Sequence, residues 1–454
     1  MPADRPLQVL HTADWHLGRT LDDQPRDVEH AAFLAWLLDV IVSRRIDVLV
    51  IAGDVFDSPN PPHQASEMYF RFLAELHAAS ECHVVVVGGN HDSPRHLEAA
   101  APLLLNHRVR VVGAMPEDAA SIAVVLPEPS RPRLVVAAIP FLRDRDVRLG
   151  KIGESIDDIA AAMRSGISRR YAEAWEHCVP HRRGVPVIAT GHLTIVGGAT
   201  SDSERLVHIG GLGAVAADAF TGNFAYVALG HLHRAQAMNE AGTVRYSGSP
   251  IALSFSEAGD EKAVRLLTFE GEQMVAQESI AVPAHRKLVR LLCEAAEAAE
   301  AIAAYAWPDC PGGCFVELTV RGGTAGAVDV RALRALLDNT PHSLLQVVVE
   351  GAGRTYSLGA GDAPTGGAAA ADAIRQLRSE PRSVFAIRLA REETLDEEDR
   401  KTLAAEFDAV LESLEQEAAA TAARVKPKNT KRTGGNAAPE AAGESDDGSA
   451  GASA

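Results

Sequence analysis

Five short apolar runs in this 454-residue chain each end at residues that can bind a metal ion. The runs cover 8–12, 46–52, 83–87, 186–190 and 226–229. Runs of this length predict buried β-strands, and the helical patterns between them indicate a layered α/β domain. In open α/β sheets, ligands bind where the strands end. We therefore expect the residues after the five runs to form one site.

The residues at these strand ends offer carboxylate, amide and imidazole donors. The predicted ligands of one cation are Asp14, His16, Asp54 and His233, and those of a second cation are Asp54, Asn90, His192 and His231. Asp54 is in both sets because one carboxylate can bridge two ions, and paired cations are a standard device for cleaving phosphate esters. A mixed donor set without thiolate favours Mn²⁺, with Fe²⁺ or Zn²⁺ as alternatives.

Gly88-Gly89-Asn90-His91-Asp92 is the most informative cluster of the five. His91 is adjacent to a predicted ligand and should point toward the substrate, where a cationic imidazole could stabilise the transition state or protonate the leaving oxygen. We expect Asp92 to hold the His91 ring and favour its protonated form. Asp57 is expected to orient a ligand. Any one of the 17 histidines is more often a surface or hydrogen-bonded residue than a ligand, but the chosen ones follow strands, usually after glycine.

Composition limits the classes of protein that fit. The net charge of −17 is unusual for a free-standing DNA binder, which suggests that a partner chain or local basic patches supply much of any nucleic-acid contact. No apolar run approaches a membrane span, and the N-terminus lacks a signal-peptide pattern. The five scattered cysteines form no disulfide framework, which fits a reducing cytosol. Cys310 and Cys314 are interpreted as flanking a turn.

The chain divides by pattern into five parts. We predict an α/β domain over 1–280, a smaller α+β domain over 281–350, a Gly/Ala-rich linker over 351–371, a helical segment over 372–420 and a disordered tail over 421–454. Helices are expected at 31–42 and 66–78, and the strands between 245 and 269 should form mixed or antiparallel sheet. The apolar stripe of the helical segment could pack on the chain itself or on a partner.

The motifs D-x-H, G-D-x-x-D, G-N-H-D, G-H and G-H-x-H, in this order, resemble the calcineurin-like metallophosphoesterases. Longer stretches are similar to the SbcD family, the nuclease subunit of the bacterial SbcC–SbcD complex. These stretches are HTADWHLG at 11–18, GHL at 191–193, SDSER at 201–205, YVALGHLHR at 226–234, YSGSP at 246–250 and LSFSE at 253–257. The resemblance is close over 1–280, extends by position over 281–350 and fades beyond 351.

The resemblance implies a metallophosphoesterase β-sandwich flanked by helices, a small capping domain and a C-terminal helical segment that binds a partner. It implies a cytoplasmic, nucleoid-associated Mn²⁺-dependent DNA nuclease of repair, recombination and replication. The implied activities are 3′→5′ exonuclease action on duplex ends and endonuclease action on single strands and hairpins. Such proteins act as homodimers within a heterotetramer with the ATPase SbcC. The catalytic histidine and the seven metal ligands of the family map onto the residues named above.

Two other functions use the same sequence features. One is a phosphoesterase acting on small phosphoesters or cyclic nucleotides, since the chemistry at phosphorus is shared. The other is a non-catalytic scaffold for DNA ends, which the complete set of ligands and His91 disfavours. Arg19 and Arg95 follow metal motifs and are the candidate contacts to the DNA backbone, with ordinary surface arginines as the alternative.

Overall fold

The computed structural model describes residues 5–149, 154–204, 214–220, 224–322, 328–350, 354–357, 401–405 and 407–408. The chain divides into two compact units, Met1–Gly361 and Asp362–Ala454. In the second unit, 401–405 and 407–408 are helical. The rest of the predicted helical segment and the whole predicted tail lie outside the described residues.

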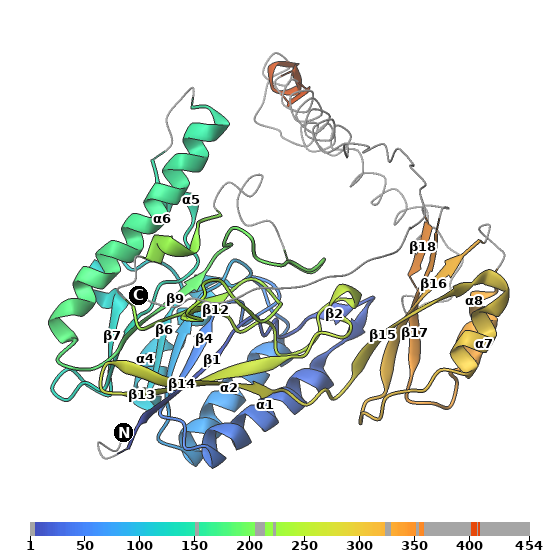
Figure 1. Cartoon of the computed structure of the whole chain (residues 1–454), viewed down its shortest axis with the longest axis horizontal. Helices are drawn as coiled ribbons and strands as arrows, with labels where there is room; N and C mark the ends of the chain where they lie inside the picture. Colours follow the sequence, from blue (N-terminus) through green and yellow to red (C-terminus); the bar gives the residue numbers. More distant parts are fainter. Residues whose placement is uncertain are drawn as a thin grey trace, which may run out of the picture. The chain divides into compact units, whose positions relative to one another are not determined.

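The first sheet has six strands in the order β14-β13-β1-β4-β5-β6 (Figure 1). Its parallel strands are β1 (Leu7–Thr12), β4 (Val48–Ala52), β5 (His83–Val87) and β6 (Val109–Val112), and its antiparallel strands are β13 (Ala263–Glu270) and β14 (Gln273–Ala281). β4 is apolar throughout because both of its faces are buried. Leu49 and Ile51 pack into the helix-covered core, whereas Val48 and Val50 pack toward the second sheet.

The second sheet also has six strands, in the order β11-β12-β10-β9-β8-β7. They are β7 (Ala123–Leu126), β8 (Leu134–Ala137), β9 (Val187–His192), β10 (Tyr226–Gly230), β11 (Gln236–Ala237) and β12 (Val244–Tyr246). β8, β9, β10 and β12 are parallel to one another, and the edge strands β7 and β11 pair antiparallel with β8 and β12. The five apolar runs thus all form strands, and the expected mixed or antiparallel pairing after residue 245 is confirmed.

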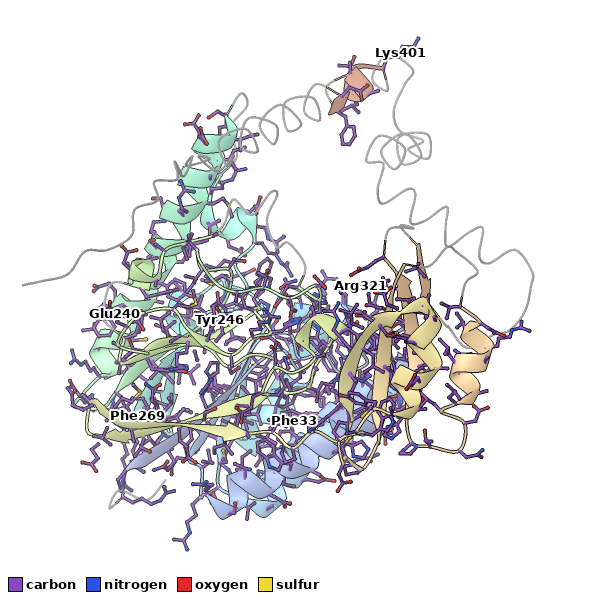
Figure 2. All side chains as sticks on the ribbon, turned by 45° about the vertical axis from the view of Figure 1, so that its right-hand side comes forward. Phe33, Glu240, Tyr246, Phe269, Arg321 and Lys401 are labelled. Atoms are coloured by element: carbon purple, nitrogen blue, oxygen red, sulfur yellow. The ribbon has the colours of Figure 1, made fainter. Side chains whose placement is uncertain are left out.

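The two sheets pack face to face, and helices cover their outer faces. α1 (Asp27–Ser43) and α2 (His63–Ala79) share a core with the first sheet, and α6 (Ile156–Cys178) shares one with the second. Phe33, labelled in Figure 2, belongs to the α1 side, and Phe269 belongs to the core between the sheets. The predicted layered α/β sandwich flanked by helices is confirmed, and both predicted helices extend slightly further at each end. The shorter elements are β2 (Thr20–Leu21), β3 (Gln24–Pro25), α3 (Pro94–Glu98), α4 (Ala101–Leu104) and α5 (Asp144–Val147).

A third sheet, with its own hydrophobic core, follows residue 286. It contains β15 (Lys287–Glu294), β16 (Cys314–Arg321), β17 (Ser343–Val349) and β18 (Arg354–Ser357), with helices α7 (Ala298–Ala303) and α8 (Val330–Ala335). We call residues 287–357 the cap. β18 corrects the predicted linker over 351–371. Arg-Thr-Tyr-Ser is a short strand sequence between glycines, and the average composition of the segment concealed it.

The cap packs against the two-sheet body within the first compact unit. Leu21 and Phe255 of the body form one apolar cluster with Leu288, Phe315 and Leu345 of the cap. The core of the body extends to Val282 and that of the cap begins at Val289, and the two cores are in contact within one compact unit.

All five cysteines are free thiols, and the Sγ atoms of Cys310 and Cys314 lie 4.0 Å apart across a turn. Neither cysteine belongs to a potential metal-binding group within the described part of the chain. Among the described residues, no helix is both long and apolar enough to span a membrane.

Candidate metal centre

The ends of β1 and β4 run side by side and meet the end of β10. The Asp14 amide donates to the Gly53 carbonyl at 3.0 Å, and the His16 amide donates to the Asp54 carbonyl at 3.0 Å. The His231 amide donates to Oδ1 of Asp14 at 2.8 Å. Since β10 belongs to the second sheet, both sheets contribute residues to one place.

Four of the predicted ligands have a left-handed backbone conformation. The φ angles are 55° at Asp14, 49° at His16, 51° at Asp54 and 100° at His231. Such conformations cost non-glycine residues roughly 1–3 kcal/mol each and persist where surrounding contacts enforce them, commonly at functional sites. The strand ends are therefore bent sharply to turn these side chains toward a common point.

Glycines at the same strand ends permit the close approach. A Cβ atom at Gly89 would lie 2.1 Å from Oδ1 of Asp54, and one at Gly53 would lie 2.3 Å from Nδ1 of His192. A Cβ atom at Gly230 would lie 2.0 Å from the Ala52 carbonyl oxygen. Any larger residue at these three positions would push the predicted ligands apart.

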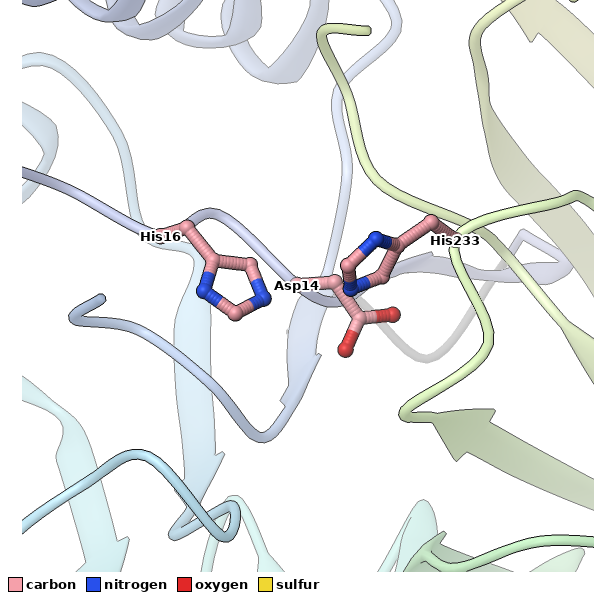
Figure 3. A group of neighbouring side chains, drawn as sticks. All are labelled: Asp14, His16 and His233. Atoms are coloured by element: carbon pink, nitrogen blue, oxygen red, sulfur yellow. The ribbon is translucent and has the colours of Figure 1, made fainter. Parts of the chain in front are cut away.

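Asp14, His16 and His233 form the first donor cluster (Figure 3). Each offers a ligand atom, and these atoms lie within 4.8 Å of one another. Oδ2 of Asp14 and Nε2 of His16 are buried and have no hydrogen-bond partner in the described part of the chain. A buried polar atom without a partner is costly, and a cation between these atoms would remove the cost.

Asn90, His192 and His231 form the second donor cluster. Oδ1 of Asn90 lies 2.8 Å from Nε2 of His192 and 3.2 Å from Nδ1 of His231. The three atoms therefore converge on one position, where a cation would take the place of the contacts between them.

Asp54 lies between the two clusters. Its Oδ2 is 3.2 Å from Nε2 of His192 in the second cluster and 3.6 Å from Nε2 of His16 in the first. Its Oδ1 accepts a hydrogen bond from the His91 amide at 2.8 Å, which fixes the carboxylate in place. This is the position that a bridging ligand requires.

The site concentrates buried negative charge. Burial raises the pKa of Asp14 to about 7, and the charge of Asp54 adds to the increase. Burial and the charge of Asp54 likewise raise the pKa of Asp92 to about 6. Burial alone would lower the pKa of His192, but its contact with Asp54 outweighs this and raises it to about 9. Buried carboxylates this close together need positive charge, so the donor set fits divalent cations.

Comparison with known proteins agrees with this geometry. The family model of the calcineurin-like phosphoesterases matches residues 7–235, half of the chain. The chain belongs to this family. The donor clusters and the family together make it a phosphodiesterase that uses divalent cations.

Three bacterial relatives narrow the assignment within the family. The chain is 39% identical over 282 residues to the SbcD component of the SbcCD nuclease of Escherichia coli (strain K12), covering 61% of this chain and 68% of the relative. For the SbcD component of Bacillus subtilis (strain 168) the values are 38% over 277 residues, 60% and 69%. For that of Rhodobacter capsulatus they are 35% over 360 residues, 76% and 87%. The chain is a member of the SbcD family, as the sequence motifs indicated.

In this SbcD-family chain, His91 lies beside the first donor cluster. Its ring is 4.7 Å from that of His16, measured between centroids. Its Nδ1 donates to the Asp57 carbonyl oxygen at 2.7 Å. Because a carbonyl oxygen can only accept, Nδ1 carries a hydrogen, and Nε2 is the ring atom whose protonation can change.

The carboxylate of Asp92, predicted to hold the His91 ring, contacts the backbone. It accepts hydrogen bonds from the backbone amides of Val55, Phe56 and Gly89 at 2.9–3.1 Å. The Asp92 carboxylate therefore joins the segment after β5 to the segment after β4. The His91 ring is held by the backbone carbonyl of Asp57. The pairing of Asp92 with the His91 ring stays a prediction.

Arg19 and Arg95, the candidate DNA contacts, have different surroundings. Arg19 donates to Oδ1 of Asp57 at 3.0 Å, and the same Oδ1 accepts from Nδ1 of His16 at 3.1 Å. The contact expected of Asp57 as an orienting residue is therefore present, and Arg19 supports it. Arg95 is exposed on α3, four residues after His91. Contact of either arginine with DNA stays a prediction.

Two polar residues near the site were not identified from the sequence as functional. Ser203 and Glu257 are buried beside His233. The only sequence signal was their presence in the SDSER and LSFSE stretches of the SbcD resemblance, which carries no chemistry by itself.

Proposed function

We propose that this chain is the nuclease subunit of an SbcC–SbcD-type complex and hydrolyses DNA with two divalent cations. The observation that carries the proposal is the position of Asp54 between the two donor clusters. The names of the relatives support nuclease action and assembly in an SbcCD complex. We propose 3′→5′ exonuclease action on duplex ends and endonuclease action on single strands and hairpins.

Each group of side chains has its own role in the proposed reaction. When bound, the two cations would neutralise charge on the scissile phosphate and supply a nucleophile from water. Asp14, His16 and His233 would hold one ion, and Asn90, His192 and His231 the other, with Asp54 common to both. His91, whose Nδ1 is fixed by the Asp57 carbonyl, would use Nε2 to protonate the leaving oxygen or to stabilise the developing charge.

Mn²⁺ is the cation that we propose. The two sets combine carboxylate, amide and imidazole donors and contain no thiolate. This mixture suits Mn²⁺, whereas the usual closed structural zinc sites contain cysteine. Fe²⁺ and Zn²⁺ remain alternatives that a metal series would separate.

A partner chain would supply much of the DNA binding. The net charge of −17 disfavours strong binding of a polyanion by this chain alone. We propose a homodimer within a heterotetramer with an SbcC-type ATPase, located in the cytoplasm at the nucleoid.

End-labelled duplex and hairpin DNA test the proposal directly. The wild-type chain, with and without a co-expressed SbcC-type partner, should cleave both in the presence of Mn²⁺ and not after chelation. Asp54→Asn is the matched inactive control. Rapid hydrolysis of a small chromogenic phosphoester, without any cleavage of DNA under the same conditions, would instead favour a small-molecule phosphoesterase.

A further inference from the structure

The imidazole of His233 is held by two buried residues from distant parts of the chain. Nδ1 of His233 lies 2.6 Å from Oγ of Ser203. Ser203 in turn donates to Oε1 of Glu257. The exposed fractions are 2% for His233, 7% for Ser203 and 0% for Glu257, so water does not compete for these contacts.

Glu257 is surrounded by donors on both carboxylate oxygens. Oε2 accepts from Nζ of Lys262 at 2.6 Å, from Oγ of Ser249 at 3.2 Å and from the Leu253 amide at 3.2 Å. Oε1 accepts from Oγ of Ser201 at 3.0 Å and from Ser203. This number of donors fits an ionised carboxylate.

The directions of these hydrogen bonds determine the tautomer of His233. An ionised carboxylate can only accept, so the single hydroxyl hydrogen of Ser203 points to Glu257. Oγ of Ser203 must then accept from His233, and Nδ1 of His233 must carry a hydrogen. The lone pair of His233 is consequently on Nε2, the nitrogen left to bind an ion with Asp14 and His16.

We propose that Ser203 and Glu257 are positioning residues that set the tautomer and orientation of His233 for cation binding. The inference rests on the proposed function, because it specifies how one ligand of that metal centre is prepared. Neither residue touches the cation or the substrate. They act through His233.

If Glu257 only stabilised the fold, its Oε2 atom would be sufficient. The contacts to Lys262, Ser249 and the Leu253 amide all use Oε2, whereas Ser203 uses Oε1. Removal of the Ser203 hydroxyl therefore leaves the buried ion pair intact. Ser254 offers a matched control, because its hydroxyl donates to the same oxygen of Glu257 at 3.4 Å, and in the described part of the chain it contacts neither Ser203 nor the His233 ring.

Titration of the purified full-length chain with MnCl₂ alone tests the inference. Wild type should bind two Mn²⁺ ions. Ser203→Ala should weaken one of them by about 10- to 100-fold and leave the other unchanged. Ser254→Ala should bind both like wild type, and Ser203→Thr, which keeps a hydroxyl, should restore binding. Wild-type affinity for both ions in a folded Ser203→Ala chain would overturn the inference while the proposed function stands.

A second variant covers the case in which Ser203→Ala is unstable. Glu257→Gln combined with Lys262→Met removes both charges of the buried pair together and so leaves no lone buried ammonium group. It should weaken the same single ion, and unchanged binding of both ions would count against the proposal. Failure of the wild-type chain to bind any Mn²⁺ would instead overturn the proposed function and this inference with it.

Discussion

The two donor clusters differ in what holds their histidines. In the first cluster, side chains orient the rings. Nδ1 of His16 donates to Asp57 at 3.1 Å, and Nδ1 of His233 donates to Ser203 at 2.6 Å. Because these partners are side chains, a single substitution outside the ligands can change how this cluster binds its ion.

In the second cluster, the backbone orients His192. Nδ1 of His192 donates to the carbonyl oxygen of Ala52 in β4 at 3.0 Å. His192 is the last residue of β9 and pairs with Gly230 of β10. A strand carbonyl cannot be removed by mutation, so affinity for the second ion should resist changes outside the ligands. We call the first donor cluster the tunable half of the centre, because side chains outside the ligands orient its histidines. The second donor cluster is the half fixed by the sheets.

The largest effect is expected at the residue that both halves share. Asp54→Asn removes a charge from both predicted ion sites and should abolish binding of both Mn²⁺ ions, with DNA cleavage falling to the detection limit. His233→Ala and His231→Ala should each weaken one ion only. Mn²⁺ titration and cleavage of labelled duplex DNA measure these outcomes. Retention of one ion at wild-type affinity in Asp54→Asn would show that the clusters do not share this carboxylate.

Substitution of His91 should slow DNA cleavage without changing the affinity for either ion. Loss of a general acid typically lowers the rate by about 10²- to 10⁴-fold, and we expect His91→Ala to fall in this range. Both ions should bind as in wild type, since His91 is in neither ligand set. Equal cleavage rates in His91→Ala and wild type would remove the proposed role of this histidine.

Which donor residues lie near one another could largely be predicted from the sequence. Parallel strands end at the same edge of a sheet, so the donors after β1, β4 and β5, and those after β9 and β10, could be expected to lie together within each sheet. The structure brings Asp14, Asp54 and His231 together, although they come from two sheets. Their roles as metal ligands await the titrations described above.

The contacts that orient these donors could not be predicted in the same way. Ser203 reaches His233 from a loop 30 residues away in sequence, and Glu257 reaches it from the end of a short 3₁₀ helix. No periodic pattern marks such contacts. Asp92 was assigned to His91 because the two are adjacent, yet its carboxylate accepts from amides of the β4 exit. Loop geometry decides which way a polar side chain points, and the hydrophobic pattern contains no information about it.

Asp57 provides a smaller test of the tunable half. Asp57→Asn weakens the acceptor that fixes the His16 tautomer, while the backbone carbonyl that holds His91 is retained. Affinity for one Mn²⁺ ion should fall by about 10- to 100-fold, as for other residues that orient metal ligands. Arg19→Gln is the matched control, because Arg19 contacts the same Asp57 oxygen but not His16, and its effect should be smaller. An equal loss in affinity for both ions would contradict the distinction between the halves.

His11 represents a third kind of buried histidine, one whose two ring nitrogens are satisfied by the protein. Nε2 donates to the Leu229 carbonyl at 3.2 Å, and Nδ1 accepts from the Tyr226 hydroxyl at 3.1 Å, which links the two sheets. Burial, reinforced by the charges of Arg265 and Arg245, lowers the pKa of His11 from 6.5 to about 3.

The expected consequence of this low pKa is a loss of stability in acid. Between pH 6.5 and 3 the unfolded chain binds a proton at His11 that the folded chain does not, so stability falls as the pH falls. The slope from this one group is about 1.4 kcal/mol per pH unit. In His11→Gln the free energy of unfolding, measured by urea denaturation in the presence of a chelator, should fall less steeply from about pH 6.5 to about pH 5 than in wild type. Parallel slopes in the two proteins would mean that His11 is not held neutral. Hydrogen bonding alone would then not distinguish His11 from the histidines predicted to bind a metal ion.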